Sequence, residues 1–434
     1  MLIIRGFVAF AVCVIMGMFS HAASAQTGSA DADDWAELKS RYNIFALRNA
    51  LEHHLDVSDG VRSLAVAYVG AFSRDFEIAD QRLAHARRYA RARGDVVLGH
   101  SVEGVANVLL REQGRFQALS ERLNGGPHSG GVWEQRVKFW SDALTSAFVD
   151  ADDFTMTNIS PDGDRIILPV SFGDTGGTML FDTGAEETLL SSSYADKYHV
   201  TPSGIRFSML TIDGPRDTEL GRISDLVFGA ARFGGISVGI QTQTDGVIGF
   251  YLNKGATGIM GYPLISRFGK IDFFVEGGRV ERLTFHRSDE RVRDGVEPNV
   301  IVREDKPYVK VRVNGEIYSC IFDTGAPRSL FSSAIINRHA KALGLNVLSK
   351  KQARKSGLSA KDNSRYVQLV PLHAGRRDLE LENVYMVETS GSDREFCLIG
   401  LDAVIKSGGA RFDMDSLKLV FGRHSAQTHL FGLR

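Results

Sequence analysis

The 434-residue sequence has almost no excess charge of either sign. Its 51 Lys and Arg residues are offset by 52 Asp and Glu residues, so the formal net charge is -1. Nucleic-acid-binding proteins usually carry a basic excess, and this balance argues against that class. Apolar residues make up 43% of the chain and charged residues 24%, as is ordinary for globular proteins. A chain of this length has room for two or three domains.

The sequence also lacks the short motifs of several hydrolase classes. It contains no His-Glu-x-x-His, no Cys-x-x-Cys and no paired acidic cation-binding loop, so no metal site and no cofactor are predicted. The segment that starts at Gly99 has Glu103 where a Gly-x-Ser-x-Gly nucleophile elbow needs glycine. The motifs therefore support neither a metallo-hydrolase nor a serine hydrolase.

Long apolar runs are absent except at the N-terminus. Arg5 precedes an apolar stretch from Gly6 to Phe19, and Ala23-Ser24-Ala25 then gives the small-x-small pattern of a cleavage site. We interpret residues 1–25 as a signal peptide and expect an exported mature protein that does not span the membrane. An uncleaved membrane anchor is the alternative, although the run is shorter than the roughly 20 residues of a membrane span.

Residues 26–125 are predicted to form a helical domain. Apolar and small residues recur at helical spacing between Ser63 and Arg93, and a similar unit follows 40 residues later, with Phe116 in the place of Phe76. The two units resemble tetratricopeptide-type helical hairpins, but an ordinary helical bundle fits the pattern equally well. Residues 126–153 are predicted to be a linker that includes one more helix.

After Asp150 the sequence consists of short strand-like runs bounded by Gly, Asp and Asn, and these runs repeat. "TMLFDTGAEETLLS" begins at Thr178 and "SCIFDTGAPRSLFS" at Ser319. "TGIMGYPLISRFGKIDFF" later in the first copy matches "FCLIGLDAVIKSGGARFDM" in the second. Asp182 precedes Gly261 by 79 residues and Asp323 precedes Gly400 by 77. Matched motifs at matched spacing predict two copies of one structural unit.

This duplicated pattern resembles the retropepsin-like aspartic proteases of the kind found among exported bacterial proteins. The resemblance covers roughly residues 154–430. It implies a multidomain α plus all-β protein, in which a helical domain precedes a bilobal, pseudo-two-fold aspartic-protease β-barrel fold. We predict lobe 1 at residues 154–287 and lobe 2 at residues 288–434.

The resemblance implies that Asp182 and Asp323 are catalytic, one from each lobe. Hydrolysis by an activated water needs both a base and an acid, and two adjacent carboxylates that cannot both ionise easily supply both. Asp174 copies the Asp-Thr-Gly triplet, but its hairpin spacing predicts a turn residue. The predicted supporting residues of the two loops are Thr183, Gly184, Ala185, Thr324, Gly325, Ala326, Gly261 and Gly400.

Each of these supporting positions has an expected role. The glycines let the backbone approach the carboxylates closely, so that N–H groups can donate to them. By family resemblance, Thr183 and Thr324 reach the opposite loop and lock the two loops together. Ala185 and Ala326 stand where the pepsin branch usually has Ser, and the missing hydroxyl should raise the pKa values of the two aspartates.

Two further features follow from the resemblance. β-Hairpin flaps usually cover the substrate, and the candidates are the segments around Asp213 and Gly214 in lobe 1 and around Asp362 in lobe 2, although ordinary surface turns fit equally well. Cys320 and Cys397 lie on strands that this fold places side by side. They are either two buried free thiols or a disulfide.

The function expected from these features is an exported, most simply periplasmic, endopeptidase that acts on a polypeptide. The helical domain would recruit or orient a protein partner. A catalytically silent peptide-binding protein on the same fold is the main alternative, and in another the helical domain is a removable pro-segment. The near-equal repeat spacing favours lobes that pair within one chain, and hence a monomeric active unit, over lobes that pair between chains.

Overall fold

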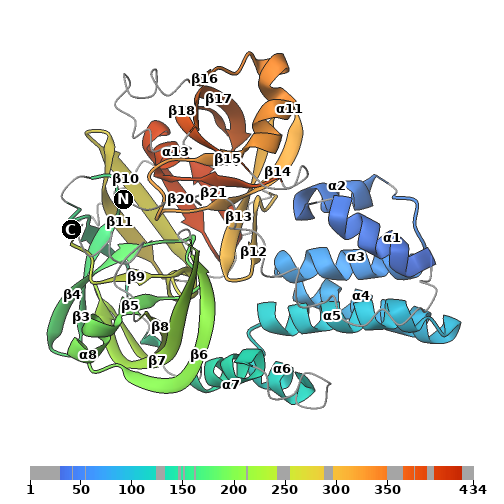
Figure 1. Ribbon diagram of the computed structural model, residues 1–434, viewed down its shortest axis with the longest axis horizontal. Helices are drawn as coiled ribbons and strands as arrows, with labels where there is room; N and C mark the ends of the chain where they lie inside the picture. The colour runs from blue at the N-terminus through green and yellow to red at the C-terminus, as the bar shows by residue number, and fades with distance from the viewer. Residues whose placement is uncertain are drawn as a thin grey trace, which may run out of the picture.

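Figure 1 shows the computed structural model, which has an N-terminal helical region followed by two β-barrel lobes, as the sequence predicted. The signal peptide predicted at residues 1–25 lies outside the described residues. No helix in the described part of the chain is long and apolar enough to cross a membrane. The structure describes residues 30–41, 43–53, 55–123, 132–144, 148–149, 152–160, 163–211, 214–241, 255–287, 297–348, 365–375, 377–388 and 395–422.

The helical region contains two helix–turn–helix units whose turns match at the 40-residue spacing of the sequence. The N–H of Asp75 donates to the carbonyl of Gly70 at 2.9 Å, and the N–H of Arg115 donates to the carbonyl of Leu110 at 2.9 Å. Gly114 adopts a positive φ in the second turn, where glycine pays no steric cost. The helices are α1 (Ala30–Arg41), α2 (Ile44–Glu52), α3 (Asp59–Phe72), α4 (Phe76–Arg93), α5 (Val96–Glu112), α6 (Phe116–Leu123) and α7 (Val132–Leu144).

Lobe 1 is a sheet with strand order β1-β8-β5-β9-β4-β3-β7-β6, which an additional β7–β8 pairing closes into a barrel. Its two long hairpins are β6–β7 and β7–β8. Apart from β2, β10 and β11, described below, the elements of lobe 1 are β1 (Phe148–Val149), β3 (Ile167–Phe172), β4 (Thr175–Phe181), β5 (Leu189–Ser191), α8 (Ser192–Lys197), β6 (Thr201–Thr211), β7 (Gly214–Phe228), β8 (Ala231–Gln241), β9 (Gly258–Met260) and α10 (Tyr262–Ile265).

Lobe 2 repeats this arrangement with strand order β12-β13-β14-β19-β15-β18-β17-β16, closed by a β13–β17 pairing. Its elements, apart from β20 and β21, are β12 (Val300–Arg303), β13 (Lys306–Val313), β14 (Glu316–Phe322), β15 (Leu330–Ser332), α11 (Ser333–Leu343), β16 (Val347–Leu348), β17 (Arg365–Ala374), β18 (Arg377–Val387), β19 (Cys397–Ile399) and α13 (Leu401–Lys406). Cys320 on β14 and Cys397 on β19 form a disulfide, so of the two alternatives the structure has the bonded pair.

A third sheet joins the two lobes, with strand order β2-β11-β10-β20-β21. At its centre Ile271 of β10 pairs antiparallel with Phe412 of β20, which is its counterpart in the repeat. The pseudo-two-fold axis therefore passes through this pair, and both lobes contribute strands to one shared sheet. The strands are β2 (Phe154–Thr157), β10 (Lys270–Glu276), β11 (Arg279–His286), β20 (Gly409–Asp413) and β21 (Lys418–Phe421).

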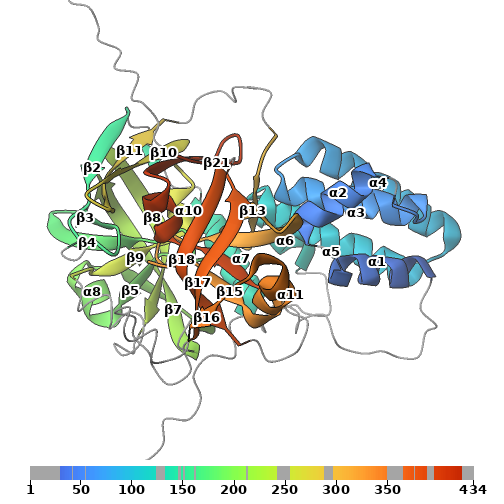
Figure 2. The same cartoon turned by 90° about the horizontal axis from the view of Figure 1, so that it is seen from above.

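The helical region packs against both lobes. Buried Ile301, Tyr308 and Ile321 of lobe 2 belong to the same apolar cluster as the cores of α1 to α5. The side chain of Asn43 adds a hydrogen bond to the carbonyl of Ile317 at 2.9 Å. Helix α7 lies instead against β6 and β8 of lobe 1 (Figure 1). Seen from above, helices α1 to α5 form one block beside the two lobes (Figure 2).

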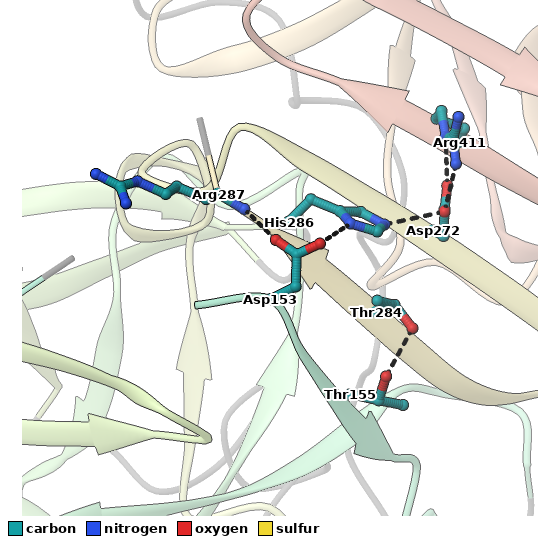
Figure 3. Close-up of polar contacts among 7 residues, drawn as sticks. All are labelled: Asp153, Thr155, Asp272, Thr284, His286, Arg287 and Arg411. Atoms are coloured by element: carbon teal, nitrogen blue, oxygen red, sulfur yellow. Dashed lines mark hydrogen bonds and ion pairs between the residues drawn. The ribbon is translucent and has the colours of Figure 1, made fainter. Parts of the chain in front are cut away.

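A chain of charged side chains crosses the joining sheet (Figure 3). Arg411 of lobe 2 donates two hydrogen bonds of 2.6 Å to Asp272 of lobe 1. One ring nitrogen of His286 lies 3.1 Å from Asp272 and the other 2.7 Å from Asp153. Burial opposes ionisation of Asp272, but hydrogen bonds from Arg411 and His286 hold its pKa at about 2. The hydrogen bond to Asp272 in turn raises the pKa of His286, and Asp153 adds to the effect.

This network predicts a pH-dependent stability. We expect His286→Gln to lower the melting temperature more at about pH 5.5 than at about pH 8.5. The folded-state pKa of His286 is raised above its ordinary value of about 6.5. The stability it contributes is therefore fully present below that value and is lost as the pH rises through the folded-state pKa. Thermal unfolding of wild type and variant across this pH range measures the difference.

The control is His373→Gln, since His373 is exposed and pairs with Asp378 at 3.0 Å on the surface of lobe 2. It should change the melting temperature little at either pH. An equal loss at both pH values for His286→Gln would contradict the assignment of a charged histidine in this network.

Candidate active site

Asp182 and Asp323 lie where two buried strands end at the junction of the lobes. Asp182 follows β4 and its N–H donates to the carbonyl of Met260 at 3.1 Å. Asp323 follows β14 and its N–H donates to the carbonyl of Ile399 at 3.0 Å. The parallel neighbours β9 and β19 thus hold each aspartate at the same point of its lobe. Both side chains keep some exposed surface.

Two buried threonines lock the aspartate loops to each other. The N–H of Thr183 donates to the hydroxyl of Thr324 at 3.0 Å, and the N–H of Thr324 donates to the hydroxyl of Thr183 at 3.0 Å. Each hydroxyl then donates onward to the opposite lobe, to the carbonyl of Phe322 at 2.6 Å and of Phe181 at 2.8 Å. All four hydrogen bonds cross between the lobes, so they fix the position of one aspartate loop relative to the other.

Glycine is required beside each aspartate because the carboxyl groups cross over the opposite loop. A Cβ on Gly184 would lie 2.5 Å from the carboxyl carbon of Asp323, and one on Gly325 would lie 2.4 Å from that of Asp182. The N–H of Gly184 donates to Asp182 and that of Gly325 to Asp323, both at 2.8 Å. Each carboxyl group is therefore oriented by its own loop and faces the other loop.

The facing carboxyl groups are electrostatically coupled. Burial raises the pKa of Asp182 well above its ordinary value, and the charge of Asp323 raises it further. Burial also raises the pKa of Asp323, against the hydrogen bonds from the N–H groups of Gly325 and Ala326. Two carboxylates this close cannot both ionise easily, so the pair retains one proton to a higher pH than an isolated aspartate would.

Ala185 and Ala326 connect the loops to the later glycine element of each lobe. Their carbonyls accept the N–H groups of Tyr262 and Leu401, both at 2.9 Å. A Cβ on Gly261 would lie 2.4 Å from the carbonyl oxygen of Glu187, and the equivalent atom on Gly400 would lie 2.7 Å from the carbonyl carbon of Arg328. Glycine lets β9 and β19 pass under the loops without a side chain between them.

The remaining sequence-predicted positions are a turn residue and the flap candidates. Asp174 is exposed in the two-residue turn between β3 and β4. Gly214 begins β7, opposite Thr211 at the tip of the β6–β7 hairpin. Asp213 and Asp362 lie outside the described residues, so only the hairpin that leads to Asp213 can be placed. Within the described ranges no group of three or more His, Cys, Asp and Glu side chains is arranged to hold a metal ion.

Several contacts near the loops were not anticipated from the sequence. Glu187, five residues after Asp182, pairs with Arg136 of α7 at 3.2 Å. Glu186 pairs with Lys306 of lobe 2 at 2.5 Å. Asp402 accepts two hydrogen bonds from Ser329. Aligning the two repeats places Ser329 opposite Thr188, so each loop has a hydroxyl at the same position. This match was the one sign in the sequence that Ser329 has a structural role.

A comparison with protein families agrees with the two lobes. Residues 168–264 and 309–403 each match the family model described as "Aspartyl protease". Each matched segment contains one Asp-Thr-Gly-Ala sequence and the later glycine. The matches and the bilobal fold support a protease-type function of this class in general. Among curated proteins nothing matches the chain.

The threonine contacts predict a specific loss of stability. Thr183→Val or Thr324→Val removes a hydroxyl that serves as both donor and acceptor, leaving a buried N–H and a buried carbonyl without partners. Each orphaned group costs about 1–3 kcal/mol of unfolding free energy. Urea unfolding measures the loss. The control Thr155→Val removes an exposed hydroxyl contact to Thr284 and should stay within about 0.5 kcal/mol. A loss no larger than the control would contradict a lock between the lobes.

Proposed function

We propose that the protein is an exported aspartic endopeptidase that hydrolyses peptide bonds with a water activated by Asp182 and Asp323. The observation that carries the proposal is the crossed pair of carboxyl groups, each aimed over the opposite loop and held by its own glycine N–H. A structural ion pair would combine opposite charges. Two facing acids at the junction of two lobes are suited instead to exchanging a proton.

The chemistry requires one proton on the pair. The ionised carboxylate takes a proton from water, whose oxygen attacks the peptide carbonyl carbon. The protonated carboxyl group gives its proton to the amide nitrogen as the C–N bond breaks. A carboxylic acid and an amine result, and the pair again holds one proton. Which aspartate acts as acid is a property of the coupled pair, so neither residue is assigned a separate role.

The substrate in this proposal is a polypeptide, and the β6–β7 hairpin that leads to Asp213 serves as the flap of lobe 1. One chain supplies both aspartates, which supports a monomeric active unit without a cofactor. The N-terminal sequence pattern supports export, and the bacterial type of resemblance supports the periplasm. The two helix–turn–helix units support a tetratricopeptide-like module that engages a protein partner.

The contacts of the helical region favour a permanent part of the enzyme over a removable pro-segment. Ile301, Tyr308 and Ile321 of lobe 2 are each at most 9% exposed, and they lie in the same cluster as the helical core. Removing the helices would expose this apolar surface to water, at a cost of about 25 cal/mol for each Å². We therefore assign the helices to the mature protein.

The first test is cleavage of casein by the purified mature chain. Wild type should cleave, and Asp182→Asn and Asp323→Asn should each lose activity by at least about 10³-fold while folding normally, because one carboxyl group cannot act as both acid and base. A pepstatin-type inhibitor should block the wild type. Asp174→Asn is the matched control and should keep full activity. Cleavage that survives either dyad variant would overturn the proposal, and a wild type that binds peptide without cleaving it would favour a silent binding protein.

The pH dependence follows from the raised pKa values of the pair. Activity should fall when the pH drops below the range in which one carboxyl group ionises, and again when it rises until both have ionised. Burial raises the pKa values of both aspartates, and the charge of Asp323 raises that of Asp182 further, so the optimum should be mildly acidic to near neutral. Initial rates from about pH 3 to 8 measure the profile. An optimum below about pH 3.5, under the ordinary Asp value near 3.9, would contradict it.

A further inference from the structure

The two aspartate loops are equivalent in sequence but are held in different ways. In lobe 2 the loop is residues 323–329, and in lobe 1 it is residues 182–188. Both end in a hydroxyl that accepts a glycine N–H, from Gly400 to Ser329 at 3.0 Å and from Gly261 to Thr188 at 3.3 Å. The contacts that hold the end of each loop to its surroundings differ between the two lobes.

Lobe 2 anchors its loop internally. The carboxylate of Asp402, at the start of α13, accepts the N–H of Ser329 at 2.9 Å and its hydroxyl at 2.6 Å. The side chain of Arg328, the residue before Ser329, is exposed. The loop that carries Asp323 is thus held by a helix of its own lobe.

Lobe 1 has no carboxylate in the equivalent place, because the repeat has Pro263 opposite Asp402. The anchor comes from outside the lobe. Glu187, which stands opposite the exposed Arg328, is 5% exposed and pairs with Arg136 of α7 at 3.2 Å. Burial raises the pKa of Glu187 to about 7, and the charge of Arg136 opposes this shift.

Arg136 is itself fixed by its surroundings. Its guanidinium carbon lies 4.0 Å from the ring centre of Phe207 on the flap strand β6 and 4.7 Å from that of Trp140 on its own helix. Aromatic faces on the side chain limit the positions that the cation can take. One side chain therefore contacts the aspartate loop of lobe 1 and the hairpin that leads to its flap.

We propose that Arg136 is a positioning residue through which α7 holds the Asp182 loop and the β6 strand of lobe 1 in register, replacing the internal anchor that Asp402 supplies in lobe 2. This role for catalysis rests on the proposed function. The mechanical part, a helix that restrains one of two equivalent loops, does not.

Hydrogen exchange tests the mechanical part without any need for activity. Arg136→Met keeps much of the side-chain volume but removes the cation. It should speed exchange in residues 182–191 by at least about tenfold and leave residues 323–332 unchanged, because local opening reports local contacts. Arg222→Met is the matched control. Arg222 of β7 lies 5.5 Å from the ring centre of Phe139 on α7 and belongs to neither loop. It should leave both segments unchanged.

A rescue variant separates positioning from general packing. Pro263→Asp gives lobe 1 the carboxylate that lobe 2 has, at the matching position of the matching helix. In the Arg136→Met background it should slow exchange in residues 182–191 back toward the wild-type rate. Asp402→Asn is the mirror experiment and should loosen residues 323–332 alone. A role in folding alone would give faster exchange in both lobes and no rescue.

Kinetics test the catalytic part. With a chain that cleaves casein, Arg136→Met should lower kcat by about tenfold or more because it displaces one carboxyl group, and should raise KM by a smaller factor because β6 leads to the proposed flap. Pro263→Asp should restore part of kcat. An Arg136→Met variant with unchanged exchange in residues 182–191 overturns the proposal whether or not the chain cleaves. If the wild type does not cleave while selective exchange and rescue are found, the proposed function fails and the restraint stands.

Discussion

The structure depends on keeping two like acids face to face. Placing the carboxyl groups of Asp182 and Asp323 together is unfavourable, because burial disfavours ionisation of both and the charge of Asp323 further disfavours ionisation of Asp182. Four hydrogen bonds between the loops oppose this, and the threonines that make them are fully buried. The glycines beside them serve the same end by leaving room for the opposing carboxyl groups. Chain duplication is one way to deliver such a pair to a single point.

Duplication did not leave the halves identical. Lobe 2 has a disulfide between β14 and β19, where lobe 1 pairs Met179 with Gly258 on the equivalent strands. Lobe 2 anchors its loop with Asp402, whereas lobe 1 uses a cation from a helix outside the barrel. The two lobes therefore hold their aspartate loops in place with different interactions. In an exactly two-fold symmetric protein Asp182 and Asp323 would have the same surroundings. The differences between the lobes give the two carboxyl groups different surroundings.

The sequence was informative where the repeat compares the chain with itself. Asp182 and Asp323 share apolar strands before them and a glycine element after them, and this pattern predicted the bilobal fold that the structure has. The helical hairpins could be predicted for a similar reason, since Phe76 and Phe116 stand at matching positions of a repeat and both begin helices. Local periodicity and internal repetition are carried by neighbouring residues, so a single sequence contains them.

Contacts between segments that are far apart in the sequence and share no repeated motif could not be predicted in this way. Arg136 and Glu187 are 51 residues apart and belong to a helix and a loop that share no pattern. The free-thiol and disulfide alternatives for Cys320 and Cys397 also depended on how closely β14 and β19 approach. In each case the decisive quantity was a distance between side chains. The sequence offered candidates for such pairs but no means of choosing among them.

The joining sheet has a consequence for how the chain folds. Helices α1 to α5 bury their apolar face against strands of lobe 2, and the hydrogen bond from Asn43 to Ile317 spans 274 residues. Lobe 1 lies between them in the sequence, and its strands β2, β11 and β10 complete the joining sheet only by pairing with β20 of lobe 2. Contacts of such long sequence separation form slowly, because a large loop must close before they contribute. A chain without lobe 2 therefore carries exposed apolar helices and an unpaired β10 edge until strands β12 to β20 have formed.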